Sequence, residues 1–194
     1  WLQRKRSQRA LNGVLLVVDL PALLHGKPEQ RVALAHGLRT RLYEVSSQLG
    51  ARLPLYVVLT KFDLLDGFDQ FYSQLPAAKR ESLLGFTFKL DAVDAFDAWL
   101  DEYDEHYGRL LTQLHEQVID RLDVLGKTAP CGRLFSLHAQ LIGLRPILQA
   151  FLRETLASDR FTTPPLVRGV YWSSVVQQGD MRNAFVREAA QPYT

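Results

Sequence analysis

The chain has few of the residues that build disulfides or metal–thiolate sites. Its 194 residues include one cysteine, Cys131. A single cysteine excludes an intrachain disulfide and fits a reducing compartment. The histidines show no metal-ligand spacing either. They are His25, His36, His106, His115 and His138. We therefore expect no metal site, and no catalytic residue stands out.

Long apolar runs are also missing. No stretch approaches the ~20 residues needed to span a bilayer, and the longest candidate, 14–20, carries Asp19. The chain opens with Trp1 and shows no signal peptide, so we expect a piece of a longer protein. The net charge of +2 does not favour a nucleic-acid partner. Basic residues at 4–9 and acidic ones at 91–105 are typical of solvated faces, with partner surfaces as the weaker alternative.

Two hydrophobic segments and the helix between them define the expected fold. Residues 11–20 and 53–59 are uniformly apolar, which is typical of strands buried on both faces of a parallel sheet. Between them, residues 29–49 carry apolar side chains at steps of three and four, which predicts a helix. Together the three elements predict a right-handed βαβ unit.

The rest of the chain extends this α/β pattern. We expect a third strand at 133–137, followed by a helix to about residue 156. A helical insertion at about 66–130 separates strands two and three, with a turn at 85–88 and one long helix ending near Leu125. After Pro164-Pro165, residues 166–174 are β-rich. They predict a linker and a small C-terminal extension at 161–194.

The most informative motif is Thr60-Lys61-Phe62-Asp63, directly after the second strand. In T-K-x-D motifs the aspartate accepts two N–H donors from guanine, and the lysine stem lies along the ring. Its place at the carboxyl end of a buried strand is where doubly wound sheets bind ligands. Thr60, Lys61 and Asp63 are therefore candidate base-binding residues. The alternative is that Lys61 and Asp63 cap the following helix, with Asp63 as N-cap.

The phosphate-binding half of a nucleotide site has no counterpart in this sequence. Gly126-Lys127-Thr128 resembles the end of a Walker A motif, but Arg121 occupies the position of its first glycine. Gly126 is better explained as the C-cap of a helix. Because phosphate contacts supply much of the affinity in such sites, we expect negligible nucleotide binding by this chain alone.

Several segments together resemble the cytoplasmic NTPase-like region of the TssM/IcmF family of type VI secretion systems. The resemblance covers most of the chain. Its segments are 4–9 followed by 11–14, 53–65, 67–68 with Phe71, 85–88, 165–171 and the spacing of Ser174, Gln177 and Gly179. It implies an α/β fold that is the C-terminal part of a P-loop/G-protein-like, mostly parallel sheet. This domain would occupy residues 1–160.

The same resemblance implies a function in protein secretion. Family members are anchored in the bacterial inner membrane by helices outside this region, which faces the cytoplasm. They assemble with TssL/DotU-like and TssJ-like subunits and contact baseplate and tail components. The chain is thus expected to be an assembly module without a cofactor of its own. The alternative is one part of a GTP- or ATP-binding, Mg-dependent NTPase whose Walker A half lies upstream.

Overall fold

The computed structural model describes residues 11–50, 52–73, 75, 84–89, 98–125, 132–156 and 165–173. In chain order the elements are β1 (Val14–Asp19), α2 (Leu20–His25), α3 (Pro28–Leu49), β2 (Pro54–Thr60), the 3-10 turn η1 (Phe62–Leu64), α4 (Phe68–Ser73), β3 (Leu84–Thr87), α6 (Ala98–Leu125), α7 (Gly132–Leu156) and β4 (Leu166–Trp172).

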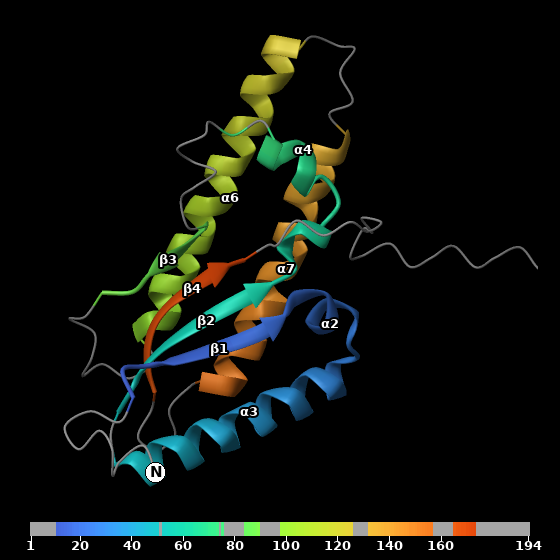
Figure 1. Ribbon diagram of the computed structural model, residues 1–194. Helices are drawn as coiled ribbons and strands as arrows, with labels where there is room; N and C mark the ends of the chain where they lie inside the picture. The colour runs from blue at the N-terminus through green and yellow to red at the C-terminus, as the bar shows by residue number, and fades with distance from the viewer. Residues whose placement is uncertain are drawn as a thin grey trace, which may run out of the picture.

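The strands form one mixed sheet in the order β1-β2-β4-β3 (Figure 1). β1, β2 and β4 run parallel, and β3 pairs antiparallel with β4. The predicted α/β class and the parallel pair at the two hydrophobic segments are therefore confirmed. In the register, Asp19 at the end of β1 lies opposite Thr60 at the end of β2. The resemblance of this sheet to that of a P-loop or G-protein domain stays a prediction.

Two short apolar segments have a different secondary structure from the one that the sequence predicts. Residues 133–137, expected to be a strand, are the first turns of α7. A five-residue apolar run cannot separate a strand from a buried helix by its pattern. Here it continues into Leu141 and Leu144, which are buried on the same helix. Residues 85–88, expected to be a turn, fall largely in β3, whose pairing partner lies some 85 residues further along the chain.

The strand after the double proline has a different place from the one expected. We expected the β-rich segment to belong to a small C-terminal extension. Instead, β4 lies inside the sheet between β2 and β3. Its interior position depends on parallel pairing with β2, a contact between distant segments that leaves no local signal. The remaining domain boundaries stay a prediction, and residues 174–194 lie outside the described part of the chain.

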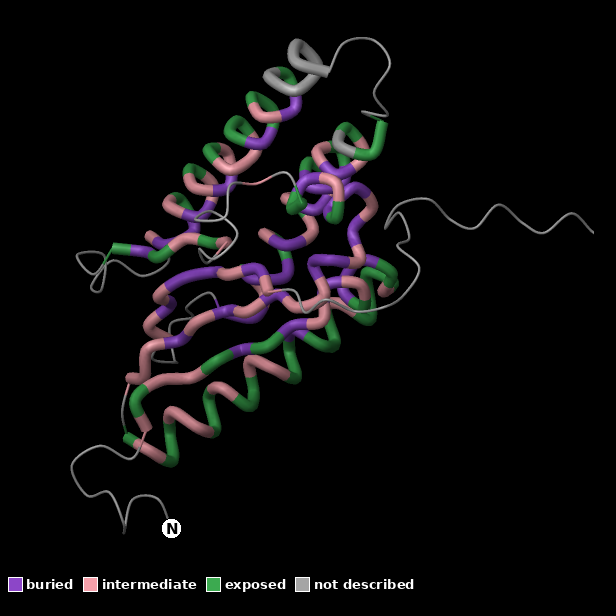
Figure 2. The backbone as a smooth tube through the Cα atoms, turned by 45° about the horizontal axis from the view of Figure 1, so that its top comes forward, coloured by how far each residue is buried: buried purple, intermediate pink, exposed green. Residues whose placement is uncertain are grey.

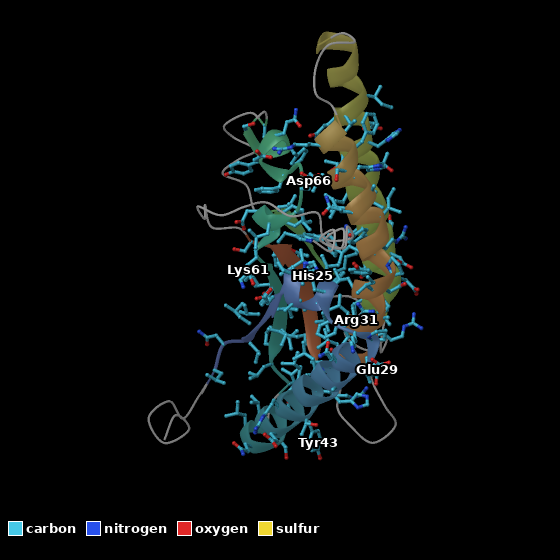
Figure 3. All side chains as sticks on the ribbon, turned by 90° about the vertical axis from the view of Figure 1, so that its right-hand side faces the viewer. His25, Glu29, Arg31, Tyr43, Lys61 and Asp66 are labelled. Carbon is cyan, nitrogen blue, oxygen red and sulfur yellow. The ribbon has the colours of Figure 1, made fainter. Side chains whose placement is uncertain are left out.

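The core lies between one face of the sheet and α7. The side view in Figure 3 shows α6 and α7 on the same side of the strands. Leucine and phenylalanine side chains of α7 form a buried stripe at helical spacing, as expected for a helix with one apolar face. The core residues of β1, β2 and β4 are Leu16, Val18, Leu55, Val57, Leu59, Val167, Val170 and Trp172, and those of α7 are Leu137, Leu141, Leu144, Leu148, Phe151, Leu152 and Leu156.

Helix α3 forms almost where the sequence predicts it but is less buried than its pattern suggests. Only Ala35 is fully buried, and Val32 and Leu34 are 47% and 45% exposed. The helix packs along α7, where the Arg39 guanidinium donates a hydrogen bond to the Glu154 carbonyl (3.2 Å). The apolar stripe of α3 is thus only partly covered by other elements of the described structure.

Helix α6 confirms the predicted long helix in its described part. Tyr103 and Tyr107 are fully buried, and the Tyr107 hydroxyl donates to the Leu141 carbonyl of α7 (2.9 Å). Arg145 of α7 holds the Asp104 carboxylate at 3.2 Å. The aspartates expected at its start, Asp91, Asp94 and Asp97, lie outside the described residues. Within the described residues, no helix combines the length and the hydropathy that a membrane span requires.

Candidate functional site

The candidate base-binding residues lie where the parallel strands end. Thr60 is the last residue of β2, and Lys61 follows with a left-handed backbone (φ 62°). Such a conformation costs a non-glycine residue about 1–2 kcal/mol. The turn is tied to the end of β4, because the Phe62 N–H donates to the Ser173 carbonyl (3.3 Å) and the Ser173 N–H donates to the Leu59 carbonyl (2.8 Å). Neighbouring strands therefore position this corner.

Thr60 and Lys61 both make contacts across to β1. The Thr60 hydroxyl donates to the Val18 carbonyl (3.2 Å), and Lys61 Nζ lies 2.5 Å from Asp19 Oδ2. Asp19 also caps α2 by accepting the Ala22 N–H on Oδ1 (3.1 Å). The lysine side chain, labelled in Figure 3, is thus held by a carboxylate of the neighbouring strand.

Asp19 is the partner of Lys61, and the sequence alone did not indicate this role. Burial raises the pKa of Asp19, but the hydrogen bonds from Lys61 and Ala22 and the lysine charge outweigh it and leave that pKa below its usual value. Because both side chains are about two-fifths exposed, their ion pair adds little to stability. The signal was available: two strands of a parallel pair end in Asp19 and Thr60, so both residues reach the same edge.

Asp63 has a different environment from Lys61. It is 9% exposed, and no described residue donates a hydrogen bond to its Oδ1. Its neighbour Phe62 is buried and meets the Phe68 ring edge-on at 5.2 Å. Asp63 lies inside the η1 turn, whose N-cap position is Lys61, and the Lys61 side chain makes no capping bond. The turn therefore holds a buried carboxylate with one unpaired acceptor.

A buried acceptor without a partner is costly, so Asp63 Oδ1 would gain from any N–H group that reached it. The structure brings Thr60 and Lys61 together with Asp19 rather than leaving the lysine free. Among the described residues, no group of three or more His, Cys, Asp or Glu side chains could hold a metal ion. Residues 126–128, with the Walker-like segment, lie outside the described residues.

Comparison with known proteins places the chain in a family. The model of the IcmF-related N-terminal domain matches residues 1–194. The chain belongs to the TssM/IcmF family. It is 32% identical over 190 residues to the type VI secretion system component TssM1 of Pseudomonas aeruginosa. That alignment covers 98% of this chain but only 17% of TssM1, so the chain spans about a sixth of that relative's length. No solved structure matches the chain.

Proposed function

We propose that this chain is an assembly module of a type VI secretion membrane-complex protein, making protein–protein contacts on the cytoplasmic face of the bacterial inner membrane. The observation that carries the proposal is its membership of the TssM/IcmF family along its whole length. Its partners would be TssL/DotU-like subunits and baseplate or tail components. Membrane anchoring would come from helices of the full-length protein outside these 194 residues.

Exposed apolar side chains on three helices provide a test of this role. Tyr43 on α3, Ile119 on α6 and Ile142 on α7 are 53%, 42% and 50% exposed. Glutamate at each position changes an exposed surface without replacing a fully buried core residue, and single exposed apolar residues are common on protein surfaces. In the full-length protein, we expect at least one substitution to reduce co-purification of the other secretion-complex subunits by about tenfold.

Two controls make that result interpretable. Arg41→Ser replaces a charged residue on α3 whose side chain is 79% exposed, and it should leave recovery unchanged. Circular dichroism melts of each variant show whether the fold is kept. Normal recovery of every subunit with all three folded glutamate variants, and also after replacement of the whole region, would contradict an assembly role.

A narrower second proposal concerns Thr60, Lys61 and Asp63 as a base contact for GTP or ATP with Mg in the full-length protein. The buried Asp63 Oδ1, to which no described residue donates a hydrogen bond, favours it. The Lys61–Asp19 pair opposes it, because the lysine must leave Asp19 to lie along a base. Hydrolysis has no such support from the described residues, so we do not propose an enzyme.

Titration calorimetry tests the base contact. We expect this chain alone to show no micromolar GTP binding. If the full-length protein binds GTP, Asp63→Asn should reduce its preference over ATP by about 1–3 kcal/mol, the value of a good bidentate base contact. Asp69→Asn, on the nearby helix α4, is the matched control and should change nothing. Unchanged discrimination in Asp63→Asn would remove the base-contact proposal.

A further inference from the structure

The exposed side of α7 is apolar along most of its length. Between Arg133 and Arg153, every exposed position whose side chain the structure describes is apolar. We call this set the outer stripe, and its members are Phe135, Ala139, Ile142, Pro146 and Ala150. Phe135 and Ile142 are 44% and 50% exposed. Steps of three and four residues keep the outer stripe on one side of the helix, over about 22 Å.

The neighbouring helix α6 has the usual surface instead. Its buried and exposed turns alternate (Figure 2), and its exposed positions include Asp101, Glu105, Arg109 and Glu116. Helices at a protein surface normally carry charged and polar residues opposite their core side. Single exposed apolar residues are common, whereas a contiguous apolar patch marks an interaction site. The outer stripe of α7 is such a patch.

Pro146 is a costly residue at its position. It stands inside α7 and is exposed. A proline in the interior of a helix removes a hydrogen bond and costs about 3 kcal/mol. A polar residue at the same exposed position would avoid this cost. A contact made at the outer stripe therefore explains the proline better than the stability of the helix does.

The outer stripe is complementary to itself. Two copies of α7 can pack antiparallel about a two-fold axis between Ile142 and Gly143, so that positions at equal distances from the axis meet. Each bulky side chain of one copy then faces a small residue of the other, an arrangement that lets two helices interdigitate. The facing pairs are Phe135 with Ala150, Ile142 with Gly143, and Pro146 with Ala139.

A second copy explains this match better than the rest of the same chain does. The small residues that receive the bulky ones, Ala139, Gly143 and Ala150, follow one another at steps of four and seven. Of the segments that the structure does not describe, only 174–194 has more than ten residues, and ten residues form a helix of only about 15 Å. The small residues of 174–194 include no two at a spacing of four or seven; they are Ser174, Gly179, Ala184, Ala189 and Ala190.

We propose that the outer stripe is a contact between two copies of this protein, with the two α7 helices antiparallel and Ile142 beside the two-fold axis. A helix pair of about 22 Å buries less than the ~1,000 Å² of a stable interface. The contact is therefore weak by itself and adds to other contacts between the full-length proteins. This inference does not rest on the proposed binding of other secretion subunits, which can fail independently.

Disulfide cross-linking of the full-length protein, in intact cells with a permeable oxidant, tests the contact and its register. In a background whose own cysteines are serine, Ile142→Cys should cross-link to a second copy of itself, because a disulfide needs Cβ atoms about 4 Å apart. The yield should exceed that of Ser47→Cys, at an exposed position of α3, by about tenfold or more.

The ends of the outer stripe should behave differently from its centre. Two copies of position 135 lie about 22 Å apart in the proposed contact, so Phe135→Cys should not cross-link to itself. Co-expression of Phe135→Cys with a differently tagged Ala150→Cys copy should give the cross-link, since these two positions face each other. A cross-link of Phe135→Cys to itself would overturn the antiparallel register and with it the proposal.

A substitution that fills a small position tests the same packing. Ala139→Leu should reduce the Ile142→Cys cross-link by about tenfold, because Ala139 receives Pro146 of the other copy. Ala33→Leu, the same change at an exposed position of α3, should leave the yield unchanged. Circular dichroism of both variants shows whether the fold is kept. Equal yields with Ala139→Leu and Ala33→Leu would contradict the proposed contact.

Three other outcomes assign the outer stripe differently, and each overturns the proposal. A cross-link from Ile142→Cys to a different subunit assigns the stripe to that subunit. A thiol at position 142 that neither cross-links nor reacts with maleimide at any dilution is covered by its own chain. A thiol that reacts with maleimide as fast as the one at position 47 and gives no cross-link lies on a free surface.

Discussion

Two neighbouring leucines on β1 have opposite environments. Leu16 is 6% exposed and belongs to the core under α7, whereas Leu15 is 67% exposed on the opposite face of the sheet. The same contrast separates Val18 from Val17. Apolar composition is identical on the two sides of the strand, so composition does not cause the difference. What differs is the presence of a covering layer, and only one face has it in the described structure.

The contrast explains both the success and the failure of the simplest sequence argument. A uniformly apolar strand predicts burial on both faces. The strand is present and parallel, as predicted, but half of the predicted burial is missing. In the described structure, only one of the two faces that the sequence of β1 predicts to be buried is covered.

The covered face depends on how α7 meets the loop before α4, and this contact should give the largest effect. Gly67 has φ 88°, and a Cβ there would lie 1.9 Å from the Arg133 carbonyl oxygen of α7. Strain and overpacking together should make Gly67→Ala lower the free energy of unfolding by about 4 kcal/mol. Urea denaturation of the chain measures this.

Gly37 supplies the matched control for that substitution. It lies in the exposed helix α3, and a Cβ there meets nothing within 4 Å. Gly37→Ala should therefore stabilise the chain by about 1 kcal/mol, the helix preference of alanine over glycine. A neutral Gly67→Ala would show that the contact between α7 and this loop is not as described. A loss of stability in Gly37→Ala would show instead that α3 is not open to solvent at that position.

The two leucines of β1 give the next largest effect and compare the faces directly. Leu16→Ala leaves a cavity under α7 and should lower the free energy of unfolding of the chain by about 3 kcal/mol. Leu15→Ala deletes the same side-chain atoms at a solvent-exposed position, so it should lower the free energy of unfolding by less than about 0.5 kcal/mol. Equal losses in the two variants, measured by urea denaturation, would mean that both faces are already covered within the 194 residues.

The smallest effect concerns the helices that form the covering layer. Burial lowers the pKa of His138 on α7, the His115 ring of α6 at 5.2 Å lowers it further, and a hydrogen bond with the Leu111 backbone opposes both. The folded state thus favours neutral His138. The unfolded chain takes up a proton near pH 6.5, so the free energy of unfolding should be steady above that pH and fall as the pH drops below it.

Thermal melts between pH 5 and pH 8, a range about the ordinary histidine pKa, measure this dependence. His138→Gln should reduce the loss of stability on acidification. His25→Gln, at an exposed position at the end of α2, should lose as much stability on acidification as the unchanged chain. An unchanged pH profile in His138→Gln would exclude this histidine as its source.

Sequence reasoning succeeded where the signal is local and periodic. The helix at 29–49 and the stripe through Leu100, Tyr103 and Tyr107 follow from spacing alone, and all three of those side chains are buried. It failed where the partner is distant in the chain. β3 is defined by its antiparallel pairing with β4, and the first turns of α7 look like a strand until their burial against other elements is known.

The candidate site divides in the same way. The motif and its place at the end of β2 could be predicted, because a buried strand followed by polar residues is a local pattern. The Lys61–Asp19 pair needs the register of β1 against β2, and the burial of Asp63 needs the packing of the η1 turn. Both arise from tertiary structure, so the sequence predicted which residues lie at the corner but not their partners.

Residue-resolved amide hydrogen exchange of β1 in this chain is the most direct test of the claim that β1 is an edge strand with one covered face among the described strands. In an edge strand alternate amides face solvent, so fast and slow exchange should alternate along Val14–Asp19. In an inner strand all amides are bonded. We predict alternating fast and slow amides along the segment, and slow exchange throughout would contradict the account.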